Sequence, residues 1–114
     1  MVTPNVVSWQ WQVYPIAHRE RRNLIIHAVT VPLFIIGAIL SAASLARFAP
    51  LATVFGLALV LGAIVAQGRG HRLEREAPQP FRSPVDALVR LVVEQFVTFP
   101  RFVLRGGFAH AWRG

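Results

Sequence analysis

The chain has 114 residues, of which 54% are hydrophobic and only 15% charged, and its mean hydropathy is +0.50. This charged fraction is unusually low for a soluble domain, so we expect one membrane domain that covers residues 1–114. The absence of cysteine excludes disulfides and thiolate metal sites, which leaves nitrogen and oxygen as metal ligands.

All 12 basic residues are arginine, and the formal net charge is +7. A nucleic-acid-binding protein would gather such residues on one polar face. Here they flank long apolar runs, which is typical of contact with anionic lipid headgroups. We therefore expect a lipid bilayer as a partner and no nucleic acid.

The first segment, residues 1–22, mixes polar and aromatic residues, including Trp9, Trp11 and Tyr14. Aromatic side chains of this kind favour the headgroup layer, so this segment is predicted to lie at the membrane interface.

Two apolar runs are predicted to form an antiparallel transmembrane hairpin. Residues 24–46 contain no formal charge, and their helix would be about 35 Å long, enough for a hydrocarbon core of about 30 Å. Residues 51–67 form the second span, which we expect to continue as a helix to about residue 75. Small residues such as Gly37 and Ser41 suit close contact between the two helices.

Residues 84–105 are predicted to form an amphipathic helix at the interface, with Ser83 as its N-cap. Its apolar face includes Leu88 and Phe96, whereas Arg90 and Glu94 are expected on the opposite, polar face. Gly106 should end the helix, and the last residues are expected to fray. The fold class is thus an all-α integral membrane protein.

Arginine placement predicts the orientation of the hairpin. Three arginines precede the first span, one lies between the spans and eight follow the second. Arginine favours the cytoplasmic side, so we expect both termini there, in a bacterial inner membrane. The start of the first span and the end of the second then share one side of the membrane.

Three histidines, His18, His27 and His71, are expected to meet on that side as metal ligands. His18 precedes His27 by nine residues, and a straight helix would separate them by about half a turn, so the chain must bend within residues 19–22. The alternative for His27 is a neutral side chain bonded to a backbone carbonyl. His110 is interpreted as a surface residue.

Polar neighbours extend the candidate site. Gln67, His71 and Glu74 would share one face of a continuous helix, although a solvated helix end gives the same pattern. Asn23 lies one turn before His27. Nitrogen ligands with open coordination positions suit iron, zinc or copper, so both an Fe(II) oxygenase and a zinc hydrolase fit these residues.

The motif Tyr14-x3-His18-x4-Asn23-x3-His27-x4-Pro32, with Gln67-x2-Gly70-His71 and a glutamate before Pro78, resembles the 2-hydroxy-fatty-acid (2-hydroxypalmitate) dioxygenase family of membrane proteins, formerly a domain of unknown function. The resemblance covers residues 14–32 and 67–100. One departure is that Glu74 lies three residues after the histidine of the Gly-His pair, where the family usually has four.

The resemblance implies Fe(2+)-dependent α-oxidation, in which O2 converts a 2-hydroxy fatty acid to a fatty acid one carbon shorter. It implies that His18, His27 and His71 are the catalytic metal ligands. Tyr14, Asn23, Gln67 and Glu74 are candidates for a further ligand or a supporting partner of the ligands. Interfacial arginines, Arg22, Arg69 and Arg72, are candidates for binding the substrate carboxylate.

Two other functions remain open from the sequence. A zinc-dependent membrane lipid hydrolase would contain zinc and consume no O2. A lipid-binding membrane protein without enzymatic activity would be indifferent to the loss of His71.

Overall fold

The computed structural model describes residues 5–114, and all secondary structure in this range is helical, which confirms the predicted all-α class. The remaining part of the predicted interfacial segment, residues 1–4, lies outside the described residues. Two helices are long, α2 (Arg21–Ala46) and α3 (Pro50–His71). The shorter elements are α1 (Val6–Val13), the 3-10 helix η1 (Tyr14–Ala17), α4 (Pro84–Val93), the π-helical turn η2 (Glu94–Thr98), α5 (Phe99–Leu104) and α6 (Gly107–Arg113).

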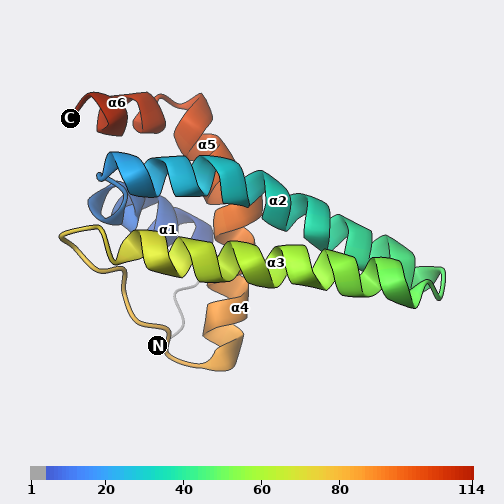
Figure 1. Cartoon of the computed structure of the whole chain (residues 1–114). Coiled ribbons are helices and arrows are strands. Elements are labelled where there is room, and N and C mark those ends of the chain that lie inside the picture. The colour runs from blue at the N-terminus through green and yellow to red at the C-terminus, as the bar shows by residue number, and fades with distance from the viewer. Residues whose placement is uncertain (1–4) are drawn as a thin grey trace.

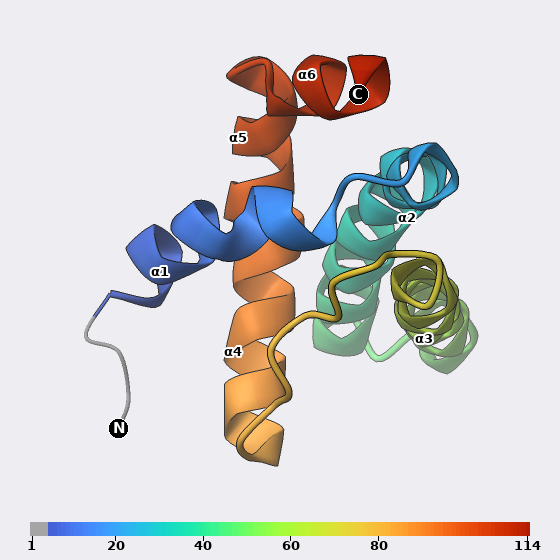
Figure 2. The same ribbon diagram turned by 90° about the vertical axis from the view of Figure 1, so that its left-hand side faces the viewer.

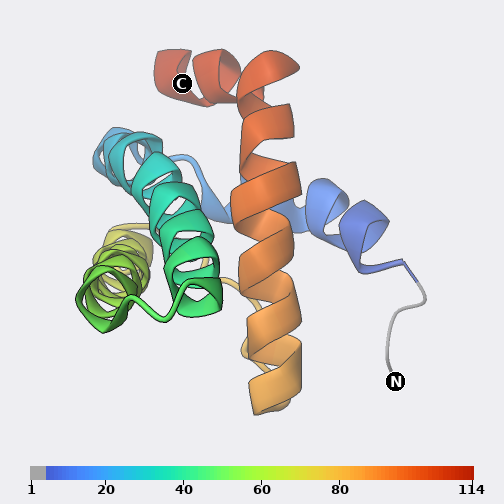
Figure 3. The same cartoon turned by 90° about the vertical axis from the view of Figure 1, so that its right-hand side faces the viewer.

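The long helices α2 and α3 lie side by side and run in opposite directions (Figures 1 and 3). Their backbones approach closely because glycine is present on both helices. A Cβ atom on Gly37 would lie 2.6 Å from the carbonyl oxygen of Gly56, and a Cβ atom on Gly56 would overlap the hydroxyl of Ser41. The predicted contact through small residues is therefore confirmed. By length and composition, both helices could cross a membrane.

The elements α4, η2 and α5 form one column that crosses the α2–α3 pair, in the half where α2 begins and α3 ends (Figures 1 and 3). The rings of Phe34 on α2 and Phe96 in the column pack edge to face, with their centroids 6.4 Å apart. The π-helical turn ends two residues before Pro100, whose ring would clash with the carbonyl of Phe96 in a regular α-helix. The wider π turn relieves that clash, so the column continues through Pro100.

Over α4 and η2, the column turns apolar side chains outward and most of its polar side chains inward. Leu88 is 63% exposed, whereas Arg90 is 9% and Gln95 0% exposed. The prediction that the polar face of this helix points to water is therefore wrong. The polar side chains of the column instead pair with polar side chains and carbonyl groups of the neighbouring elements, and this pairing offsets the cost of burying them.

The segment α1–η1 crosses the column and leads into the start of α2 (Figure 2). Tyr14, predicted to lie in the headgroup layer, is instead buried in the main apolar cluster with Leu24, Val31, Phe99 and Phe102. The four side chains that join Tyr14 there come from α2 and α5, so the cluster fixes the N-terminal segment between the long helices and the column.

Two helix ends differ from the predictions. The helix α3 ends at His71 and does not reach residue 75. Two glycines, Gly68 and Gly70, weaken its last turn, and the next carboxylate, Glu74, binds elsewhere, as described below. Beyond Gly106, whose φ of 83° ends α5, the chain forms α6 where a frayed end was predicted. Arg21 holds α6 against α2 through a 2.7 Å hydrogen bond to the carbonyl oxygen of Trp112.

Candidate metal centre

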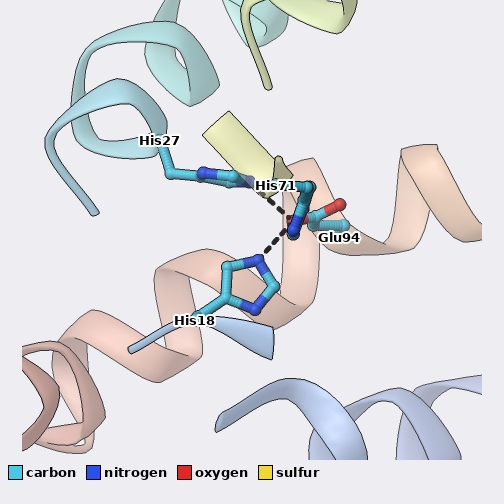
Figure 4. Close-up of side chains that lie close together, drawn as sticks. All are labelled: His18, His27, His71 and Glu94. Atoms are coloured by element: carbon cyan, nitrogen blue, oxygen red, sulfur yellow. Dashed lines mark ion pairs between the residues drawn. The ribbon is translucent and has the colours of Figure 1, made fainter. Parts of the chain in front are cut away.

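Four side chains from separate segments converge on one point: His18, His27, His71 and Glu94 (Figure 4). One nitrogen or oxygen atom of each lies within 4.8 Å of those of the other three. His18 follows η1, His27 lies in the second turn of α2, His71 ends α3 and Glu94 begins the π turn. The bend that brings His18 toward His27 lies at residues 18–20, between η1 and α2.

Backbone carbonyls orient two of the imidazoles. Nδ1 of His18 lies 2.7 Å from the carbonyl oxygen of Tyr14, and Nδ1 of His27 lies 3.0 Å from that of Asn23. A carbonyl can only accept, so each Nδ1 carries the proton and donates it. Each Nε2 is then left with a lone pair directed at the centre, as in histidines that bind metals.

Glu94 supplies a carboxylate at the centre. Its Oε2 lies 3.4 Å from Nε2 of His18 and 3.3 Å from Nε2 of His27, and it accepts a 2.8 Å hydrogen bond from the hydroxyl of Tyr14. Burial acts to raise the pKa of Glu94, but hydrogen bonds and positive charge from His18 and His27, which their protonated forms provide, outweigh burial and hold this pKa well below its ordinary value. Burial, and then the charge of Glu94, raise the pKa of Tyr14, so the phenol keeps its proton and donates it.

The ring nitrogens at the centre have no hydrogen-bond partner among the described residues. They are Nε2 of His18, Nε2 of His27 and Nδ1 of His71, and all three are buried. Buried polar atoms are normally paired, so three unpaired nitrogens around one carboxylate require an explanation. A cation bound between them provides one, and the set of three nitrogens and one carboxylate fits a metal ion.

Glu94 was not identified from the sequence, which placed it on the solvent face of an amphipathic helix. One signal could have revealed it: the polar residues Arg90, Glu94, Gln95 and Thr98 interrupt a helix whose other side is strongly apolar. In a membrane protein such a stripe faces the protein interior.

Glu74 lies outside the centre, where it supports the start of α2. Its carboxylate accepts hydrogen bonds from the backbone N–H groups of Arg19 and Glu20 at 2.9–3.1 Å and from the Asn23 side-chain amide at 2.7 Å. Asn23 precedes His27 by one turn and itself packs against Gly70, where a Cβ atom would overlap its Oδ1. Glu74 and Asn23 therefore position the segment that carries His18 and His27.

Gln67 also lies beside the centre and does not join it. It exchanges two hydrogen bonds with Gln95, at 3.0 and 2.8 Å, and donates a third to Thr30 at 3.0 Å. A second polar pair, Gln10 and Thr98, joins α1 to the same π turn. These bonds fix the column against α1, α2 and α3, and thereby fix Glu94.

A cavity of about 420 Å³ adjoins the centre and reaches His18, His71 and Glu94. The arginines expected to bind a carboxylate, Arg22, Arg69 and Arg72, are exposed and do not line it. Arg90 does line it. Its guanidinium donates to the carbonyl oxygens of Gln79 and Pro80 and to Asp86, and its Nε has no partner among the described residues.

Residues 5–101 match the family described as 2-hydroxy-palmitic acid dioxygenase Mpo1-like. The chain belongs to this family. The match includes all four residues of the centre and extends from α1 into α5, while α6 lies beyond it. No curated protein and no solved structure matches the chain.

Proposed function

We propose that this Mpo1-like protein is an Fe(II)-dependent dioxygenase that converts 2-hydroxy fatty acids to fatty acids one carbon shorter. The observation that carries the proposal is the centre itself: three buried imidazole nitrogens without a hydrogen-bond partner, gathered around one carboxylate and next to a cavity, in a chain of this family.

The electrostatics of the centre support a bound cation. With Nδ1 protonated, the Nε2 atoms of His18 and His27 direct lone pairs at Oε2 of Glu94 from 3.4 and 3.3 Å. Lone pairs at this distance repel one another unless positive charge lies between them. A single divalent ion would satisfy these atoms and Nδ1 of His71 together, whereas separate protons would leave excess charge buried.

The ligand set and the family description together favour iron. Nitrogen and carboxylate ligands without sulfur suit non-haem Fe(II), and they also suit zinc. The family is described as a dioxygenase, and of iron and zinc it is iron that activates O2. When bound, Fe(II) would supply the site at which O2 and the 2-hydroxy acid are brought together.

The chain's own residues would orient the ligands and the substrate. Tyr14 holds the Glu94 carboxylate in place, and backbone carbonyls hold the rings of His18 and His27. Arg90 brings a positive charge to the wall of the cavity and is the described arginine best placed to attract the substrate carboxylate. The other cavity walls are mainly apolar and would exclude water from the reaction.

The reaction needs no external reductant. One 2-hydroxy acid and one O2 have the same atoms as the shortened acid, one CO2 and one water. The bond between the carboxyl carbon and the hydroxyl-bearing carbon breaks, and the latter carbon becomes the new carboxyl group while O2 is reduced.

We infer that α2 and α3 cross the membrane as a hairpin, with both termini on the cytoplasmic side. Support comes from the apolar surfaces of both helices and from the placement of the arginines. The column of α4 and α5 crosses the hairpin and turns apolar side chains such as Leu88 and Phe96 outward, which suits a helix at the membrane interface.

The proposal is tested with protein purified in detergent, loaded anaerobically with Fe(II) and given 2-hydroxypalmitate and O2. We expect pentadecanoate and CO2 in equal amounts, with one O2 consumed for each. His27→Ala should abolish the product, and His110→Ala, a change in α6 outside the centre, should not. Protein that binds iron but forms no pentadecanoate would refute the proposal, and protein that retains only zinc and consumes no O2 would favour a hydrolase.

A further inference from the structure

The cavity beside the centre combines a few polar groups with mainly apolar walls. His18, His71, Glu94 and Arg90 contribute its charged and ionisable lining, and most of the remaining lining area is apolar. Ligand cavities with a few polar groups among apolar walls typically fix a polar head and accept an apolar tail. Because His18, His71 and Glu94 belong to the candidate metal centre, a polar head would lie beside them and an apolar tail would leave along another part of the cavity wall.

The cavity-lining residues of α3 indicate the direction in which the cavity extends away from the centre. Ile64, Gln67, Gly68 and His71 all line the cavity, and their spacing places them along one face of α3. The seven residues from His71 back to Ile64 correspond to about 10 Å along the helix axis. Because His71 ends α3 and Ile64 lies within its long apolar stretch, the cavity extends from the centre toward the part of α3 that would lie in the bilayer.

Gly68 keeps this wall open. A Cβ atom there would meet nothing within 4 Å, so close packing does not require glycine at this position. Its backbone is helical, and glycine costs a helix about 1 kcal/mol relative to alanine. By contrast, Gly37, Gly56 and Gly70 each face atoms that a Cβ would overlap. The structural effect of glycine at position 68 is an absence of side-chain volume in the cavity wall.

We propose that the acyl chain of the substrate runs from the metal centre over Gly68 and along Ile64 into the bilayer, so that side-chain volume at position 68 limits the length of acyl chain that the protein accepts. This inference rests on the proposed function for the identity of the ligand. The carboxyl end of the acid lies at the centre, and the methyl end leaves between α3 and the column.

The test compares Gly68→Leu with Gly62→Leu. Both glycines lie on α3, and neither position has an atom within 4 Å of a built Cβ, but only Gly68 lines the cavity. Leucine favours the helix at both sites, so both variants should fold. Binding is measured on metal-free protein in lipid nanodiscs, using a 2-hydroxypalmitate analogue with a photoreactive diazirine at its methyl end. The crosslinked residues are located by mass spectrometry.

We expect the natural chain and Gly62→Leu to crosslink beyond Ile64, on the side away from His71, and Gly68→Leu to lose at least tenfold in yield, about the scale of size discrimination in apolar pockets. Gly68→Ala should lose less. In turnover by iron-loaded protein, Gly68→Leu should keep activity on 2-hydroxybutanoate, whose chain is too short to reach position 68, and lose it on 2-hydroxypalmitate. Equal crosslinking by the two leucine variants, or equal loss on both substrates, would overturn the inference.

The two proposals fail separately. If crosslinking depends on position 68 while no pentadecanoate forms, the acyl path stands and the dioxygenase function does not. If pentadecanoate forms equally in both leucine variants, the dioxygenase function stands and the acyl path is wrong.

Discussion

The hydroxyl of Tyr14 donates a 2.8 Å hydrogen bond to Oε2 of Glu94, the same oxygen that faces the imidazoles of His18 and His27. The ring of Tyr14 also stacks on that of His18, with centroids 3.7 Å apart. One side chain from the N-terminal segment therefore orients two residues of the candidate centre.

Tyr14→Phe removes the hydroxyl and keeps the stacked ring. We expect the affinity for Fe(II) to fall by about 10–100-fold, because the partner that orients a ligand is lost. Anaerobic titration in competition with a chromophoric chelator measures the change. Trp11→Phe is the control, since the Trp11 ring stacks under the Arg101 guanidinium and contributes no atom to the centre. An unchanged affinity in Tyr14→Phe would show that this hydrogen bond does not support the ligand.

Glu94→Gln should lower the metal content of the protein, whereas Glu74→Gln should mainly lower its stability. The first removes the carboxylate of the centre and should leave the purified protein with little metal. The second removes the charge that accepts the N–H groups at the start of α2, which should cost about 1–2 kcal/mol of stability while most metal is retained.

Elemental analysis of the two purified variants, together with unfolding in detergent, separates these effects. Were Glu74→Gln to lose as much metal as Glu94→Gln, Glu74 would act as a ligand, and the arrangement described here would not be the metal-bound one.

Gly70→Ala should destabilise the protein. The new methyl group would overlap the buried Oδ1 of Asn23, whose amide is held by Glu74, so the helices must move apart at a cost of about 1–3 kcal/mol. Gly68→Ala, two residues earlier on the same helix, meets open space and should be neutral or slightly stabilising. Unfolding curves in one detergent compare the variants, and equal stability of the two would argue against the Asn23–Gly70 contact.

The orientation of the hairpin can be tested directly because the chain contains no cysteine. Single cysteines at Arg47, in the turn between α2 and α3, and at Arg75, after α3, report the two sides. A maleimide that cannot cross membranes, applied to spheroplasts, should label Arg47→Cys at once and Arg75→Cys only after permeabilisation. The reverse pattern would place both termini outside.

The sequence predicted the helical framework because the signals are local. Long charge-free runs, a short break between them and small residues at contact positions indicated α2 and α3 to within a few residues. It also indicated three histidines that the structure brings together, with ring centroids 4.7–5.0 Å apart.

Glu94 could not be reached in the same way. Its position depends on where the column crosses the hairpin and on a π turn, and both follow from contacts between segments distant in sequence, such as Gln67 with Gln95. Helical spacing alone gives the two faces of the column without stating which face is buried. Similarly, helical spacing placed Glu74 on one face with His71. In the structure its carboxylate instead accepts hydrogen bonds from the N–H groups just before α2.

The four side chains of the centre come from four separate parts of the chain. This arrangement affects how the protein folds. An ion bound by them would close a loop between each successive pair, from His18 to His27, on to His71 and on to Glu94. A disulfide stabilises a small domain by constraining its unfolded chain, whereas an ion held only by the folded arrangement stabilises it by its free energy of binding. In a protein without cysteine, the metal would add a cross-link between the N-terminal segment, the column and the paired long helices, beside the hydrogen bonds and the apolar cluster that already join them.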